Sequence, residues 1–194
     1  MTPLIGHFQI RNRGTLGGSV AHADPAGEYP AVALALDAVM EVASIRGRRL
    51  IAAREFFTGF WSTAMAPDEL LVSVRFPAWT GRTGFAVHEF ARRFGDFAVA
   101  GAVTGVEVDH AGRITRCTLG LFGLGSTPLR ATGAEQAAIG LDAAGSFDEV
   151  GAMAMAELTD VPSDLHGSAG YRRRVGAAMV ARALRDATRE ASDA

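Results

Sequence analysis

Residues 10–30 read Ile-Arg-Asn-Arg-Gly-Thr-Leu-Gly-Gly-Ser-Val-Ala-His-Ala-Asp-Pro-Ala-Gly-Glu-Tyr-Pro, and they carry the densest chemistry of the chain. Because glycine has no Cβ, the backbone at Gly14, Gly17 and Gly18 can lie close to a flat or anionic group. Thr15 and Ser19 flank Gly17 and Gly18 with hydroxyls that can donate hydrogen bonds. A turn that presents hydroxyls and backbone amides in front of a helix suits a nucleotide-like ligand.

The residues after the glycines predict the start of a helix. Asp24 is typical of an N-cap and Pro25 of a first helical position, and the apolar run Ala31–Leu36 follows them. The glycines have neither the GxGxxG spacing of a dinucleotide-binding fold nor the Lys-Ser or Lys-Thr that follows in a P-loop. Spacing alone leaves two interpretations open: a tight turn between two elements, or a ligand-binding loop.

The types of residue in this stretch are more informative than the spacing of its glycines. The stretch Ile10–Pro30 resembles the second FAD-contacting stretch of the flavoprotein (medium) subunits of molybdenum hydroxylases, the carbon monoxide dehydrogenase and xanthine dehydrogenase family. In that family an R-N-x-G-T-[IL]-G-G loop precedes A-D-P and an acidic residue. Later stretches resemble the family in the same order: Pro67–Leu71, Phe90–Arg93 with Gly95–Ala98, and Pro162–Ser168.

This resemblance implies a flavoprotein with a role in electron transfer. The chain would hold FAD, take electrons from an iron-sulfur small subunit and pass them to an external acceptor. Substrate would be hydroxylated on a molybdopterin-containing large subunit, so this chain would contribute no catalytic residue and no metal ligand. We therefore expect an oxidoreductase subunit that works in a hetero-oligomer and leaves the chemistry to its cofactor.

The resemblance also implies which residues contact FAD. Glu28 matches an acidic position that bonds polar groups of FAD, and Leu71 falls where the family packs an apolar residue on the flavin. His88 occupies a position that is Lys in some relatives. For Glu28 the alternative is a solvated carboxylate in the first turn of a helix, and for Leu71 an ordinary buried strand position. The loop that lies along the cofactor is matched by Thr15, Leu16, Gly17, Gly18 and Ser19.

One motif of the family has no counterpart here. Complete flavoprotein subunits carry an A-G-G-x-S loop in an N-terminal subdomain, whereas Met1 stands just before the second loop. We therefore expect a chain that lacks this subdomain and whose FAD site can be lost, because half a site removes contacts while the entropic cost of holding the ligand remains. The alternative function is a truncated interaction module that binds no flavin and docks on the molybdenum and iron-sulfur subunits.

Composition narrows the class of protein. Of 194 residues, 48% are hydrophobic and 21% charged, as in globular proteins, and a net charge of -2 gives no reason to expect nucleic acid or a membrane as partner. The single Cys117 excludes an internal disulfide, and the scattered histidines lack metal-ligand spacing. Because we find neither a signal peptide nor a run long enough to span a bilayer, we expect a cytoplasmic protein.

Periodicity predicts an α+β chain with two domains. Residues 1–80 are expected to form the second part of an FAD-binding domain, in which a mixed or antiparallel sheet packs with helices. A polar, glycine-rich boundary follows, and residues 84–194 resemble the C-terminal domain of the carbon monoxide dehydrogenase flavoprotein. There we expect a three-stranded antiparallel sheet packed on a helical bundle, with strands at Phe85–Ala91, Val99–Val108 and Ile114–Phe122.

The last predicted helix, Ser168–Ala191, has apolar residues at helical spacing along one face. Arg172, Arg173 and Arg174 stand near its start, where positive charge opposes the helix dipole. Two interpretations are open for these arginines: a solvated face of the helix, or a patch that contacts another subunit.

Overall fold

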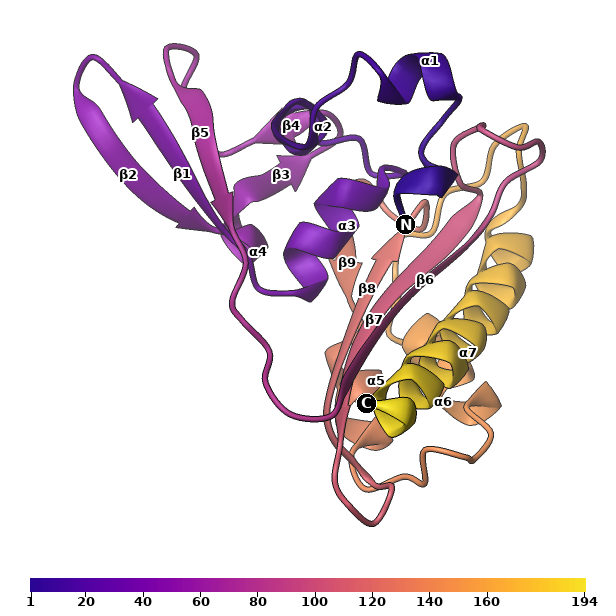
Figure 1. Cartoon of the computed structure of the whole chain (residues 1–194). Helices are drawn as coiled ribbons and strands as arrows, with labels where there is room; N and C mark the ends of the chain where they lie inside the picture. Colours follow the sequence, from indigo (N-terminus) through magenta and orange to yellow (C-terminus); the bar gives the residue numbers. More distant parts are fainter.

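A computed structural model describes all residues from Met1 to Ala194 and has two larger sheets joined by a central helix, together with a short two-stranded sheet (Figure 1). The N-terminal part contains η1 (Thr2–Leu4), α1 (Phe8–Arg11), α2 (Leu16–His22), α3 (Glu28–Ala35), β1 (Val39–Ser44), β2 (Gly47–Ala52), α4 (Ala53–Phe56), β3 (Phe57–Gly59), β4 (Ser62–Thr63) and β5 (Leu70–Arg75). The remainder contains β6 (Thr83–Phe90), β7 (Ala100–Val108), β8 (Ile114–Phe122), β9 (Leu129–Arg130), α5 (Thr132–Ala138), α6 (Asp148–Ala156) and α7 (Ala169–Asp193).

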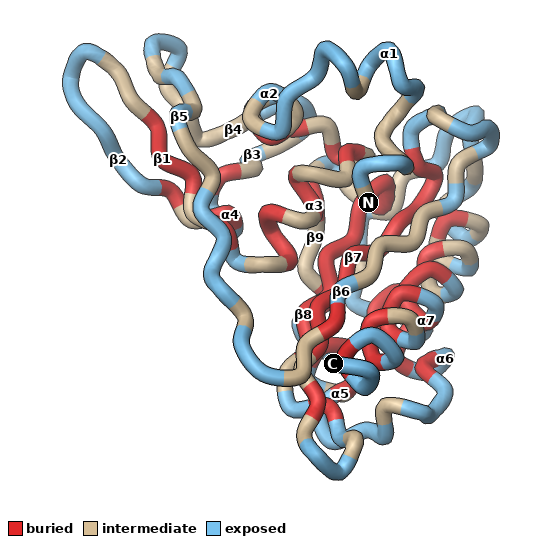
Figure 2. Tube along the Cα trace, in the orientation of Figure 1, coloured by how far each residue is buried: buried red, intermediate tan, exposed pale blue.

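The first sheet is small and projects from the rest of the chain (Figure 1). Its strands are antiparallel in the order β2-β1-β5, with Met40 opposite Ile51 and opposite Val74. Met40 and Val42 point into a small core with Val20 of α2 and Phe56 of α4. The first residues of β2 are exposed, as the pale blue tip of this sheet shows in Figure 2. Only the base of the sheet is therefore anchored in a core.

The second sheet is an antiparallel meander in the order β6-β7-β8-β9. One face packs on α5, α6 and α7 through the largest core of the chain, which includes Leu119, Leu121 and Leu184. Figure 1 shows α7 lying along this face, with α3 on the opposite side of the sheet. The predicted α+β class, the three predicted strands and the helices behind them are confirmed, and the short β9 adds a fourth strand that the prediction did not include.

Helix α3 joins the two cores. Ala33 and Leu34 belong to the core of the first sheet, whereas Ala31 and Ala35 pack with Val103 and Phe122 of the second sheet. A helix that is apolar on all sides is typical of a buried position. Its close approach requires Gly120 on β8, where a Cβ would lie 2.8 Å from the carbonyl oxygen of Ala31.

The predicted helix start at Asp24 and Pro25 is wrong. The chain instead forms α2 through the glycines, ends it at Ala23 with a left-handed φ of 56°, and begins α3 at Glu28 with Gly27 as N-cap. The Asp24 carboxylate accepts a hydrogen bond from the amide of Ala26 at 2.9 Å, so it stabilises the turn between the two helices.

The arginines at the start of α7 have structural partners that the sequence did not reveal. Arg172 is buried and makes two hydrogen bonds to the carboxylate of Asp164, at 2.7 and 2.8 Å. Arg173 donates to the carbonyl oxygens of Met155 and Leu158. Both interpretations of the cluster are therefore wrong for Arg172, whereas Arg173 is partly exposed and Arg174 is exposed.

No helix of the structure combines the length and the apolar composition that crossing a bilayer requires.

We expect Gly120→Ala to destabilise the fold by about 1–3 kcal/mol, because the added methyl group pushes α3 away from β8. Urea unfolding followed by circular dichroism measures the change. Gly170→Ala is the matched control, since a Cβ there meets no atom within 4 Å. Equal free energies of unfolding for the two variants would contradict the close approach of α3.

Candidate functional site

The predicted cofactor loop forms the first turn of α2. The hydroxyl of Thr15 caps the helix by accepting a hydrogen bond from the amide of Gly18 at 2.9 Å. The first amides of a helix have no partner within the helix and are free to bind an anionic or polar group. Thr15, Leu16 and Gly18 are exposed, and Gly17 and Ser19 are partly exposed. The turn therefore offers hydroxyls and amides on an accessible surface.

Gly17 leaves open space above this turn. A Cβ at Gly17 would meet no atom within 4 Å, and its φ is not in the left-handed region. Neither the backbone conformation nor the surrounding space therefore requires glycine at position 17. At Gly18 the space is limited, because a Cβ there would lie 2.9 Å from the Thr15 hydroxyl. A glycine with open space above it fits a surface against which a flat cofactor lies.

Leu71 is close to α2. It lies on β5, is partly buried, and packs against the core that contains Val20 of α2. The structure therefore brings Leu71 and the predicted loop to the same part of the chain. The alternative interpretation of Leu71, an ordinary packed strand position, describes its contacts equally well.

Glu28 opens α3 and meets a second carboxyl group, that of Glu89 on β6. Burial and the nearby charge of Asp24 raise the pKa of Glu28. Burial raises the pKa of Glu89 to about 7, with further contributions from the charge of Glu28 and a hydrogen bond between the two groups. The Oε2 atom of Glu89 is buried without a hydrogen-bond partner. The interpretation of Glu28 as a freely solvated carboxylate is therefore wrong.

Sequence reasoning missed Glu89, although strand alternation contains a signal for it. Val87 packs against the core cluster that includes Ala31 and Ala35 of α3, whereas Ala86 packs against the core beneath α7. Because side chains two positions apart in a strand share a face, Glu89 faces α3 together with Val87. A carboxylate on the covered face of a strand is expensive to bury without a partner, and this marks Glu89 as unusual.

His88 lies on the other face of the same strand. Its Nε2 atom is 2.7 Å from a carboxylate oxygen of Asp186 on α7, and this contact lowers the pKa of Asp186. The structure therefore does not bring His88 together with Glu28, because the sheet separates their side chains. A cofactor contact by His88 stays a prediction without support from these positions.

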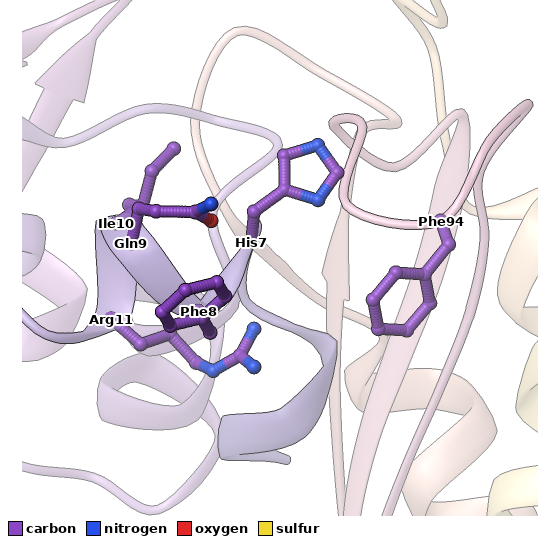
Figure 3. A pocket seen from close by; sticks show the side chains of 6 residues that line it. All are labelled: His7, Phe8, Gln9, Ile10, Arg11 and Phe94. Carbon is purple, nitrogen blue, oxygen red and sulfur yellow. The ribbon is translucent and has the colours of Figure 1, made fainter.

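Two hollows lie in the surface, and none of the predicted site residues lines either of them. The first, of about 650 Å³, is lined by Phe94 and the residues His7 to Arg11 immediately before the loop, and Figure 3 shows His7 on the side of α1 that faces Phe94. The second, of about 710 Å³, lies between Asp24 and Trp61 on one side and Phe97 and Arg172 on the other. Both hollows lie where the two parts of the chain meet.

The chemical groups of the predicted site residues are of types that can bind FAD. Hydroxyls, free helix amides, open space above Gly17 and an acidic acceptor at Glu28 suit the polar and flat groups of the cofactor. No group of three or more histidine, cysteine, aspartate or glutamate side chains is arranged to hold a metal ion. The arrangement can bind and orient a cofactor, and it contains no set of residues placed for acid–base or nucleophilic chemistry.

Comparison with protein families assigns both parts of the chain. Residues 1–79 match the FAD binding domain in molybdopterin dehydrogenase, and residues 85–187 match the CO dehydrogenase flavoprotein C-terminal domain. The chain belongs to the FAD-binding medium subunits of the molybdenum hydroxylases. The family resemblance inferred from sequence is thereby confirmed, whereas the division into domains near residues 80–84 stays a prediction.

Individual relatives agree with this assignment. The chain is 42% identical over 190 residues to the 6-hydroxypseudooxynicotine dehydrogenase complex subunit alpha of Paenarthrobacter nicotinovorans, a match that covers 96% of this chain and 63% of the relative. It is 35% identical over 193 residues to the carbon monoxide dehydrogenase medium chain of Afipia carboxidovorans, a match that covers 98% of this chain and 66% of the relative. The chain thus spans less than two thirds of the length of these relatives.

Solved structures of relatives share the fold. A Cu,Mo-CO dehydrogenase superposes with a TM-score of 0.90 at 33% identity, covering 96% of this chain and 65% of the other. Quinoline 2-oxidoreductase from Pseudomonas putida 86 gives a TM-score of 0.89 at 31% identity, covering 97% and 65%. The fold is therefore shared with chains of a CO dehydrogenase and of a quinoline 2-oxidoreductase.

We expect Thr15→Ala to destabilise the protein by about 1 kcal/mol, because the amide of Gly18 loses its capping oxygen. Thr15→Ser keeps that oxygen and should retain most of the stability. Thermal and urea unfolding of the two variants measure the difference. Identical stabilities would show that the cap contributes nothing to α2.

Proposed function

We propose that this chain is the FAD-binding electron-transfer part of a molybdenum hydroxylase or dehydrogenase. In this role it takes electrons from an iron-sulfur subunit to FAD and passes them to an external acceptor. The open, hydroxyl-bearing first turn of α2, with Leu71 packed against the core to which α2 contributes Val20, is the observation that carries the proposal. FAD supplies the redox chemistry when bound, and the residues of this chain bind and orient it.

Most of the predicted residues have a task in this proposal. Thr15 and Ser19, with the free amides at the start of α2, bind phosphate or ribityl oxygens. Leu71 supplies an apolar surface for the flavin, and Glu28 accepts hydrogen bonds from hydroxyl groups of FAD. Gly17 keeps the space above the turn open for the cofactor. His88 has no such task, because its side chain contacts Asp186 on the α7 face.

The proposed partners are a molybdopterin-containing large subunit and an iron-sulfur small subunit. The names of two relatives support a complex, since one is a subunit alpha of a dehydrogenase complex and the other a medium chain. The holoenzyme would be a hetero-oligomer, and we propose a cytoplasmic location, where a lone cysteine such as Cys117 stays reduced.

A second candidate function is an interaction module that binds no flavin. The exposed apolar side chains Phe8, Ile10, Phe94 and Phe97 favour it, because large exposed apolar groups are typical of surfaces that contact another chain. In this alternative the chain docks on the molybdenum and iron-sulfur subunits, and the turn at α2 only shapes the surface.

Titration of the purified chain with FAD, followed by flavin absorbance and fluorescence, tests the proposal. We expect binding, and we expect Gly17→Leu to raise the dissociation constant at least tenfold, or about 1.4 kcal/mol, because leucine fills the open space. Its fold should be intact, since leucine has a higher helix propensity than glycine.

Gly170→Leu is the matched control, because a Cβ at Gly170 also meets open space but lies on α7. It should bind FAD as the parent does. Tight binding by Gly17→Leu would contradict the assignment of the α2 turn. Absence of bound flavin, together with co-purification of molybdenum and iron-sulfur subunits, would favour the interaction module.

A further inference from the structure

Two carboxyl groups from distant parts of the sequence meet between α3 and β6. Glu28 is the first residue of α3, and Glu89 lies one residue before the end of β6, on the face toward α3. Both side chains are partly shielded from solvent, and the Oε2 atom of Glu89 is fully buried without a hydrogen-bond partner. A buried oxygen without a partner is costly unless a proton is shared with a neighbouring acceptor.

The charges around the pair do not neutralise it. Asp24, in the turn before α3, adds a further negative charge near Glu28. Among the groups that shift these two pKa values, the amino group of Met1 is the one positive charge, and it lowers the pKa of Glu89. Two carboxylates that lack a cation between them ionise in two separated steps.

Strand alternation and helix packing hold the two groups in place. Glu89 follows Val87 on the face that packs against α3, and the turn before α3 is fixed by a hydrogen bond from the amide of Gly123 to the carbonyl oxygen of Pro25 at 2.8 Å. Neither carboxyl can therefore move far from the other without disturbing a packed element. The pair is built into the junction between the two parts of the chain.

We propose that Glu28 and Glu89 share one proton, and that protonated Glu89 is a positioning residue that holds Glu28 as a hydrogen-bond acceptor for the hydroxyl groups of FAD. In this arrangement Glu89 donates to one oxygen of the Glu28 carboxylate, and the other oxygen accepts from the ligand. The inference rests on the proposed function, because it takes Glu28 as a cofactor contact.

Loss of the shared proton changes the site in two ways. Without the shared proton, Glu89 no longer donates a hydrogen bond to Glu28, and a second negative charge accumulates beside a cofactor that carries an anionic pyrophosphate. Since the pKa of Glu89 is about 7, this change falls within the working range of most enzymes. FAD affinity is therefore high at pH 6 and falls as the pH rises above 7.

The dissociation constant of FAD, measured from pH 6 to 8.5 on the parent chain and on Glu89→Gln, tests the inference. Linkage to one proton gives about a tenfold weaker affinity per pH unit above the pKa, so we expect the parent to lose about tenfold or more across this range. The glutamine amide donates without titrating, and Glu89→Gln should keep the pH 6 affinity at every pH. Glu149→Gln, an exposed position on α6, is the matched control and should follow the parent.

A measurement made without FAD tests whether Glu28 and Glu89 share a proton. Carbon-13 NMR of labelled glutamate carboxyl groups should show one residue that titrates near pH 7 in the parent and is missing in Glu89→Gln. Because the pKa of Glu89 is raised on folding, the parent should also lose stability between about pH 4.5 and 7 and change no further above it, while Glu89→Gln should not show this loss.

The outcomes separate this inference from the proposed function. Equal pH profiles of FAD binding for the parent and Glu89→Gln would overturn the positioning role, even with FAD bound. Absence of the NMR titration near pH 7 would overturn the shared proton. If the parent binds no FAD at any pH, the proposed function fails and the positioning role fails with it, while the NMR titration still decides the shared proton.

Discussion

Burial of α3 on two sides is the constraint on which the rest of the structure depends. Its small residues let the helix lie against β8, where Gly120 leaves room for the backbone at Ala31, and its other side closes the core of the first sheet. Hydrogen bonds hold both ends: Gly123 donates to Pro25 before the helix, and Arg130 donates to the carbonyl oxygen of Leu34 near its end. The junction between the two parts of the chain is therefore a packed core, not a flexible link.

The candidate site takes its geometry from this helix. Because α3 is fixed at both ends, Glu28 at its first position is fixed relative to β6, and α2 is held at the surface just before it. Exposed residues of α2 can then serve a ligand, while Val20 on the inner side of the same short helix contributes to the core. The exposed first turn of α2 can therefore bind a cofactor without removing the core contacts that Val20 makes from the same helix.

Local patterns predicted the parts of the fold that short-range physics determines. The strand-forming residue types along Ile114–Phe122 and the helical spacing of apolar residues along the last helix were sufficient, because both signals lie within one element. The start of α3 was wrong because Asp24 and Pro25 have the residue types of a helix start, whereas Gly17 and Gly18 have a low helix propensity. The cap from Thr15 and the burial of Val20 outweigh that propensity.

The parts of the site that sequence could not predict depend on contacts between distant residues. Glu89 becomes unusual only because α3 brings Glu28 against it, and His88 is directed away from the site by one position of strand alternation. Arg172 likewise lies in a cluster that resembled a surface patch, but Asp164 and two backbone carbonyls enclose it. No local pattern contains these partners.

The most direct test of the account is a map of amide chemical shifts in the nitrogen-15 labelled chain as FAD is added. We predict saturable shifts at Thr15–Ser19, at the start of α3 and at Leu71, with the amides around His88 and Asp186 unchanged on the other face of the sheet. Shifts concentrated on the α7 face, or no shifts at any concentration of FAD, would contradict the claim that this chain holds its cofactor at the turn of α2.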